Sequence, residues 1–179
     1  MVENKLKIRI SFLMMFLFAS CYHGVNNHIF HTKIDSFEKV YNQSMKSFIE
    51  REDTSLLQIK AKSRNESIES RVHYIGSIHT LENKEIRCYL VRNRYGYINS
   101  PHGNTQIVIV INKSIVGSYH GLDYHICAMI KNNKLYLKND NNTLYTTIDM
   151  DRSIPESFII KDDSCDYGEE YHIVREKSW

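Results

Sequence analysis

The chain has 179 residues, of which 42% are hydrophobic and 25% charged, with only seven glycines and two prolines. This composition suits one domain with a real core and excludes a low-complexity chain or a repeat array. The formal net charge is +2, but the first twenty residues hold three of the 23 cationic side chains and one of the 21 acidic ones, so the remainder is formally neutral. A neutral remainder has no general basic field for nucleic acid or an anionic membrane, and we expect no nucleic-acid partner.

Residues 1–20 predict a secretory signal peptide. Three basic side chains, Lys5, Lys7 and Arg9, precede a short apolar run that ends at Phe18. The run is too short to span a bilayer as a helix, which takes about 20 residues. A charged start, a short apolar middle and small residues at the end are typical of a signal that is removed after export.

The end of this segment, Leu-Phe-Ala-Ser-Cys at residues 17–21, resembles the lipobox of bacterial lipoproteins. Ala19 and Ser20 match the small residues of that motif, whereas Phe18 departs from it because an aliphatic residue is usual there. The resemblance implies that a lipid such as palmitate is attached to the Cys21 thiol and that the signal is cut just before it. The alternative is ordinary cleavage near Ala19, which leaves a secreted protein with Cys21 as a structural thiol.

The residue after Cys21 bears on the localisation of the protein. In enterobacterial lipoproteins an Asp at this place is associated with retention in the inner membrane, and this chain has Tyr22 there. The resemblance therefore implies a bacterial cell-envelope protein, held by its lipid on the periplasmic face of the outer membrane. Several acyl chains together hold a protein to a bilayer durably.

Residues 21–34 are expected to form a flexible tether before a single domain of residues 35–179. The tether contains His23, His28 and His31, but their spacing fits no closed metal site, so we expect no metal there.

One amphipathic helix is expected at the N-terminus of the domain. Apolar residues recur there at helical spacing, and Asp35 with Glu38 forms a plausible capping box. The stripe consists of Phe37, Val40, Tyr41, Met45, Phe48 and Ile49. The pattern does not decide whether Leu56–Ile59 extends the helix or begins a strand.

From about Arg71 the period changes to that of strands separated by Asn-rich turns. The expected strands are 71–79, 86–91, 107–111, 115–120, 122–130, 135–138, 143–148, 157–161 and 171–175, with 94–99 either a turn or a further pairing segment. The continuous apolar run 107–111 predicts a strand covered on both faces. Short connections favour antiparallel pairing. The predicted fold class is therefore α+β: the helix, then a mainly antiparallel meander that curls into a half-barrel or splits into two layers.

Three cysteines remain after Cys21, namely Cys88, Cys127 and Cys165. Export to an oxidising compartment permits one disulfide between two of them, and the sequence does not choose the pair. All three as reduced thiols is the alternative.

No segment carries a convincing catalytic, cofactor or metal motif. Ser118 and His120 lie in a Gly-Ser-Tyr-His-Gly stretch without the residue that a nucleophile elbow places between Gly and Ser, so we interpret it as a hairpin. The acidic loop 162–170 lacks the glycine position of a calcium-binding EF-hand. His73 and His79 are about 20 Å apart along a strand and cannot share a metal.

Two function classes remain. The first is a non-catalytic, lipid-anchored module that binds another protein, as inhibitor, immunity or assembly lipoproteins do. The second is a small periplasmic enzyme whose histidines and carboxylates converge from dispersed positions. The missing motifs favour the first class.

Overall fold

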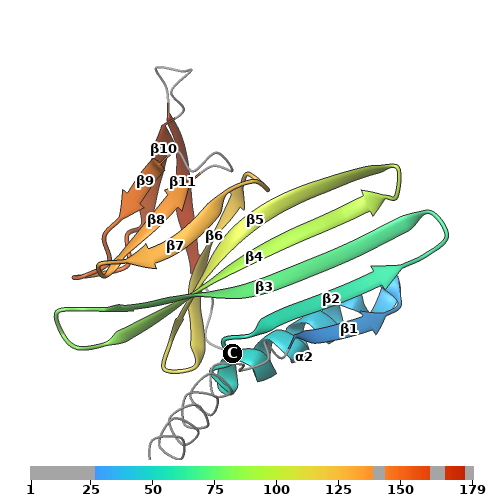
Figure 1. Ribbon diagram of the computed structural model, residues 1–179, viewed down its shortest axis with the longest axis horizontal. Coiled ribbons are helices and arrows are strands. Elements are labelled where there is room, and N and C mark those ends of the chain that lie inside the picture. Colours follow the sequence, from blue (N-terminus) through green and yellow to red (C-terminus); the bar gives the residue numbers. More distant parts are fainter. Residues whose placement is uncertain (1–26, 139–143, 162–167, 176–179) are drawn as a thin grey trace, which may run out of the picture.

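The computed structural model describes residues 27–138, 144–161 and 168–175 (Figure 1). Most of this part is strand, arranged as one open mixed sheet of eight strands and a small sheet of three. The large sheet has the order β1-β2-β3-β4-β5-β6-β11-β10, and the small sheet has the order β7-β8-β9. A single α-helix, α2 (Phe37–Glu50), follows the short 3-10 turn η1 (Ile34–Ser36) within the described ranges.

The strand bounds follow the chain. The large sheet contains β1 (His28–Thr32), β2 (Leu56–Lys62), β3 (Glu66–His79), β4 (Glu85–Tyr97), β5 (Ser100–Ile111), β6 (Ser114–Leu122), β10 (Ser157–Lys161) and β11 (Gly168–Arg175). The small sheet contains β7 (Cys127–Lys131), β8 (Lys134–Lys138) and β9 (Leu144–Ile148).

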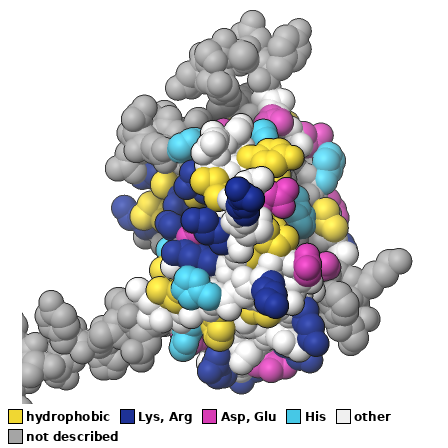
Figure 2. Space-filling view, turned by 90° about the vertical axis from the view of Figure 1, so that its right-hand side faces the viewer, with side chains coloured by type: hydrophobic (Ala, Val, Ile, Leu, Met, Phe, Trp, Pro, Cys, Tyr) yellow, Lys and Arg dark blue, Asp and Glu magenta, His cyan; other side chains and the backbone are white. Residues whose placement is uncertain are grey.

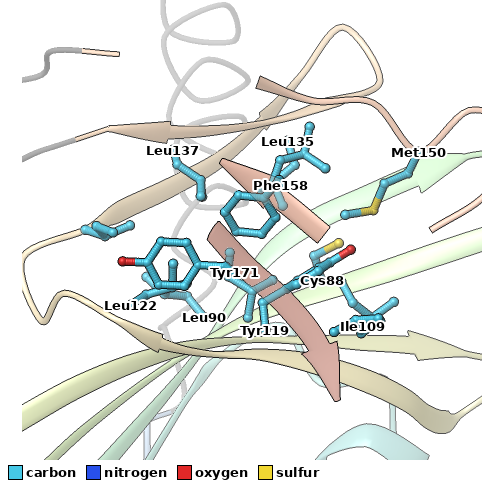
Figure 3. Packing of buried hydrophobic residues seen from close by; sticks show 14 of the residues in the cluster. Cys88, Leu90, Ile109, Tyr119, Leu122, Leu135, Leu137, Met150, Phe158 and Tyr171 are labelled. Atoms are coloured by element: carbon cyan, nitrogen blue, oxygen red, sulfur yellow. The ribbon is translucent and has the colours of Figure 1, made fainter. Parts of the chain in front are cut away.

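The large sheet is the middle layer of the molecule, with a hydrophobic core on each side. On one side α2 packs on β2 to β5, and we call the buried cluster there the helix-side core. Its members are Met45, Phe48, Ile49, Leu57, Ile59, Val72, Tyr89, Val91, Val108 and Val110. On the other side the small sheet packs over β3 to β6, and β10 and β11 contribute Phe158 and Tyr171 to this small-sheet core (Figure 3).

Strand β5 confirms the prediction of a strand covered on both faces. It lies between β4 and β6 in the sheet. Ile107 and Ile109 point into the small-sheet core, whereas Val108 and Val110 point into the helix-side core. All four side chains are buried, which is why the run is continuously apolar and does not alternate.

Strand β3 serves both cores because a β-bulge interrupts its pairing with β4 between Tyr74 and Gly76. Val72 belongs to the helix-side core, but Ile78, an even number of residues later, belongs to the small-sheet core. One inserted residue reverses which face the following side chains occupy. Gly76 has a φ of 130°, and a Cβ placed on it would lie 3.2 Å from the Ile130 side chain.

The start of the domain corrects three expectations. The predicted N-terminal amphipathic helix is not the first element, because β1 precedes α2, and Phe37, Val40 and Tyr41 of the predicted stripe are only half-buried. Residues 28–32 of the expected tether 21–34 form β1, which pairs in parallel with β2. A parallel pair needs a crossover, and α2 is that crossover, so the sheet is mixed. The predicted capping box is also wrong, because the capping residue is Ser36 and it makes no side-chain cap hydrogen bond.

Two open questions of the sequence are settled. Leu56–Ile59 belongs to strand β2, and 94–97 continues β4 towards the β4–β5 connection. The β2–β3 and β4–β5 connections project together at the end of the large sheet away from the small sheet (Figure 1). In the part of the chain that the structure describes, no helix is both long and apolar enough to cross a bilayer.

Candidate binding site

A groove of about 420 Å³ opens on the helix side of the large sheet, where the N-terminal half of α2 lies beside the projecting ends of β3, β4 and β5. Its lining combines aromatic rings with neutral polar side chains. The residues are Phe37, Tyr41, Ile68, Ser70, Asn93, Tyr95, Asn104 and Gln106. None of these eight carries a charge at neutral pH.

The floor of the groove is a hydrogen-bonded row that crosses three strands. Ser70 of β3 lies opposite Asn93 of β4, which lies opposite Asn104 of β5. The Ser70 hydroxyl donates to Asn93 Oδ1, and Asn93 Nδ2 donates to Asn104 Oδ1 at 3.1 Å. This chain fixes the orientation of both amides. It also leaves the Asn104 amide nitrogen without a partner among the described residues, so this donor is available to a ligand.

Aromatic rings border this row. Phe37 and Tyr41 are four residues apart on α2, and their rings stack with centroids 6.2 Å apart. The Gln106 amide nitrogen donates to the Tyr41 hydroxyl at 3.5 Å, which joins the helix to β5. Tyr95 is 42% exposed, on the same face of β4 as Asn93 because strand side chains alternate. The groove thus offers ring surfaces around a polar strip.

The expected site cysteines are distributed as follows. Cys21 and Cys165 lie outside the described residues. Cys88 is fully buried in the small-sheet core, and burial raises the pKa of its thiol to about 12 (Figure 3). Cys127 is exposed on β7, and no disulfide joins it to Cys88. Of the three pairings that the sequence allowed, the one between Cys88 and Cys127 is absent.

The histidines of the expected tether do not form a metal centre in the described part. His23 lies outside it, and His28 Nε2 lies 2.9 Å from Asp53 Oδ2. Burial works to raise the pKa of Asp53, but hydrogen bonds from Ser55 and the contact with His28 outweigh it and lower that pKa. No group of three or more His, Cys, Asp or Glu side chains within the described ranges is arranged to hold a metal.

Ser118 and His120 share one face of a strand and are in contact. They lie within β6, which is one arm of the antiparallel β5–β6 hairpin, and Ser118 Oγ lies 2.7 Å from His120 Nε2. Ser118 is only 3% exposed, however, and the described residues give His120 no carboxylate partner. A catalytic triad needs an acid to orient the histidine, so the pair lacks the arrangement for nucleophilic catalysis.

Most of the acidic loop 162–170 lies outside the described residues. Its last residues begin β11, where Glu169 accepts a hydrogen bond from Tyr171 and Glu170 accepts one from Ser157 at 2.6 Å. These carboxylates therefore bind neighbouring side chains of the sheet.

Sequence reasoning did not single out the groove. Two local signals could have indicated parts of it: the aromatic pair Phe37 and Tyr41 on one turn of a helix, and Asn93 with Tyr95 two residues apart on a strand. Neither signal shows that the two parts meet.

No family model, curated protein or solved structure gives a significant match to this chain. Function therefore has to be inferred from the chain's own geometry and chemistry.

Proposed function

We propose that this chain is a lipid-anchored protein of the bacterial cell envelope that binds another protein in its groove, without turnover. The observation that supports this most directly is the composition of the groove. Its eight lining residues are aromatic, aliphatic or neutral polar, and none is Asp, Glu, His, Cys, Lys or Arg. Such a surface can bind but has no acid, base or nucleophile poised for neutral pH.

The chemistry of the groove suits a polypeptide partner. Interface cores are depleted in charged residues and enriched in aromatic ones, with Tyr prominent among hot spots. Tyr95 and the Phe37–Tyr41 pair offer ring surfaces to apolar side chains. Asn104 and Gln106 offer amide groups that pair with backbone N–H and C=O groups.

The anchor is the second part of the proposal. A lipid on Cys21, after removal of residues 1–20, would hold the domain on the periplasmic face of the outer membrane. Confinement to that surface raises the effective concentration of any partner displayed there. Mass spectrometry of the membrane fraction tests the anchor. We expect a mature chain that starts at lipid-modified Cys21, and a Cys21→Ala protein that remains membrane-bound and fully processed would contradict it.

A small periplasmic enzyme is the second candidate, and the short Ser118–His120 contact is the observation that favours it. Burial of the serine and the missing carboxylate partner of the histidine argue against it, as described above. A secreted form without lipid is compatible with either activity.

Site-specific photocrosslinking tests the binding function. A photoreactive phenylalanine analogue in place of Tyr95, in the intact envelope, is expected to give a discrete protein adduct, and Asn104→Ala in that protein should weaken it. The matched control is the same analogue at Tyr136, which lies on β8 of the small sheet. Adduct at neither position, together with turnover of an envelope substrate that His120→Ala abolishes, would favour the enzyme instead.

A further inference from the structure

The face of the large sheet opposite the groove is strongly basic at its projecting end. Side chains alternate along strands, so residues between the groove residues of β3 and β4 point to the other side. We call this surface the basic face, and it consists of Lys60, Lys62, Arg71, Arg92 and Arg94 around Glu69, the one carboxylate at the described β2, β3 and β4 positions of this face. Lysine and arginine side chains gather on the left of the view in Figure 2.

One carboxylate cannot balance these cations. Glu69 Oε1 lies 2.7 Å from Arg71 Nε and 3.9 Å from Lys60 Nζ, and Glu69 also faces Arg94 across the β3–β4 pairing. Burial works to raise the pKa of Glu69, but hydrogen bonds from Arg71 and from a neighbouring glutamine outweigh it and lower that pKa. Glu69 is therefore ionised and already engaged.

The arginines show the excess charge most clearly. Arg71 lies directly opposite Arg92, and like charges at that spacing destabilise a sheet. Arg92 donates to the backbone oxygen of Ile126 at 3.0 Å, and its buried Nε has no partner among the described residues. Burial, Arg92 and Arg71 all lower the pKa of the half-buried His73 beside them. An anion on this face would relieve the repulsion between these arginines that Glu69, shared with Arg71 and Lys60, leaves in the described part of the chain.

We propose that the basic face lies against anionic phospholipid headgroups of the membrane that holds the anchor, an inference that rests on the proposed lipidation of Cys21. Strand β1 borders this face, with His31 paired to Lys60. Cys21 precedes His28 by only seven residues, a chain that reaches at most about 25 Å. An anchored domain thus has its basic face within reach of the bilayer, and acylation combined with a polybasic surface gives stable attachment.

This arrangement revises the expectation from net charge. The chain after residue 20 is formally neutral, so its sequence predicts no attraction to an anionic membrane. The sheet instead separates the charges in space and concentrates cations on one face. Docked in this way, the domain turns its groove, on the other side of the same strands, away from the lipid.

Vesicle binding by the unlipidated protein tests the basic face alone. A chain made from Tyr22 onward keeps every helix and strand of the described structure, because all of them lie after residue 27. We expect it to sediment with vesicles of phosphatidylcholine and phosphatidylglycerol, but not with vesicles of pure phosphatidylcholine. Salt at about 1 M should release it, because the Debye length falls to about 3 Å there and the attraction between charges is screened.

Charge variants locate the effect. Arg71→Gln with Arg94→Gln should weaken vesicle binding at least tenfold, and Lys60→Gln with Lys62→Gln should do so independently. The matched control, Lys113→Gln with Lys131→Gln, removes the same charge from two exposed positions, one in the β5–β6 turn and one at the end of β7, and should leave binding unchanged. Thermal unfolding checks that each variant is folded.

The outcomes separate this proposal from the proposed function. The membrane docking would be overturned by equal binding to neutral and anionic vesicles, by no binding to anionic vesicles, or by an equal loss of binding in the control variant. Binding to a DNA oligonucleotide or to an acidic protein, with none to vesicles, would also overturn it. If vesicle binding fails but the crosslink at Tyr95 persists in the protein with Arg71→Gln and Arg94→Gln, the groove proposal stands and the basic-face proposal falls. If vesicle binding is as expected but no crosslink forms at Tyr95 in the intact envelope, the groove proposal falls and the basic-face proposal stands.

Discussion

Truncation of Ile109 is the sharpest test of the small-sheet core. Ile109 is 0% exposed near the C-terminal end of β5, so Ile109→Ala removes three buried carbons and leaves a cavity. Such substitutions cost about 2–5 kcal/mol of unfolding free energy. The matched control is Ile159→Ala on β10, where the side chain is 49% exposed and the change should stay within about 0.5 kcal/mol.

The neighbouring residue tests the other side of the same strand. Val108 is 4% exposed in the helix-side core, and Val108→Ala removes two buried carbons, worth about 1.6 kcal/mol before any cavity cost. Val174 on β11 is 53% exposed and serves as its control. If only one face of β5 were covered, one of the two buried substitutions would behave like its exposed control.

Urea unfolding followed by far-ultraviolet circular dichroism measures these changes. The midpoint should fall for Ile109→Ala and Val108→Ala with an unchanged slope, because the surface exposed on unfolding is nearly the same. In a thermal scan the Ile109 variant should lose about 4–20 °C, given a few degrees per kcal/mol for a domain of this size. Equal midpoints for Ile109→Ala and Ile159→Ala would refute the assignment of β5 to the centre of the sheet.

Three further predictions follow from single sites. Gly76→Ala should lower the free energy of unfolding in urea by about 1–3 kcal/mol, because a φ of 130° strains any side chain and a β7 side chain lies 3.2 Å from the new Cβ. The control Gly121→Ala has a φ of 78° with open space around it, so it should lower the free energy of unfolding by less. The reverse order would contradict the close approach at Gly76. As pH falls through the ordinary histidine pKa of about 6.5, the unfolded chain should protonate His73 before the folded chain does, so unfolding free energy should decrease with falling pH, and His73→Gln should flatten this part of the profile. In the reduced native protein, iodoacetamide should modify Cys127 and spare Cys88, whose thiol pKa is raised to about 12 by burial, and peptide mass spectrometry showing prompt labelling of Cys88 would contradict that burial.

The parts of the fold that the sequence predicted are those set by local chemistry. The run 107–111 indicated a doubly covered strand because no polar side chain interrupts it. The pairs Asn112–Lys113 and Asn132–Asn133 indicated turns, and all four residues have positive φ, as tight hairpin turns require. In each case a few neighbouring residues carry the whole signal.

The parts that escaped prediction depend on distant partners. Strand β1 has the sequence His-Ile-Phe-His-Thr, which is short and half polar and carries little strand signal. It forms a strand by pairing with β2 and lying beside α2, both of which come later in the chain. The bulge at Gly76 reverses the faces of β3, so strict alternation from Val72 misplaces Ile78. The groove and the basic face can be recognised only when the register of three or four strands is known. A shift of one residue would move the groove side chains of a strand to the basic face and its basic side chains to the groove.

The place of β11 in the sheet has a kinetic consequence. This strand, residues 168–175, lies between β6 and β10, so β6 has its second neighbour only after some fifty further residues have been made. Until then one edge of β6 is an unpaired template for other chains. Pairings between such distant segments form late and slowly. Folding of the large sheet in a nascent chain would therefore finish only after β11 has been made, and a chaperone that shields β6 during this interval would limit aggregation.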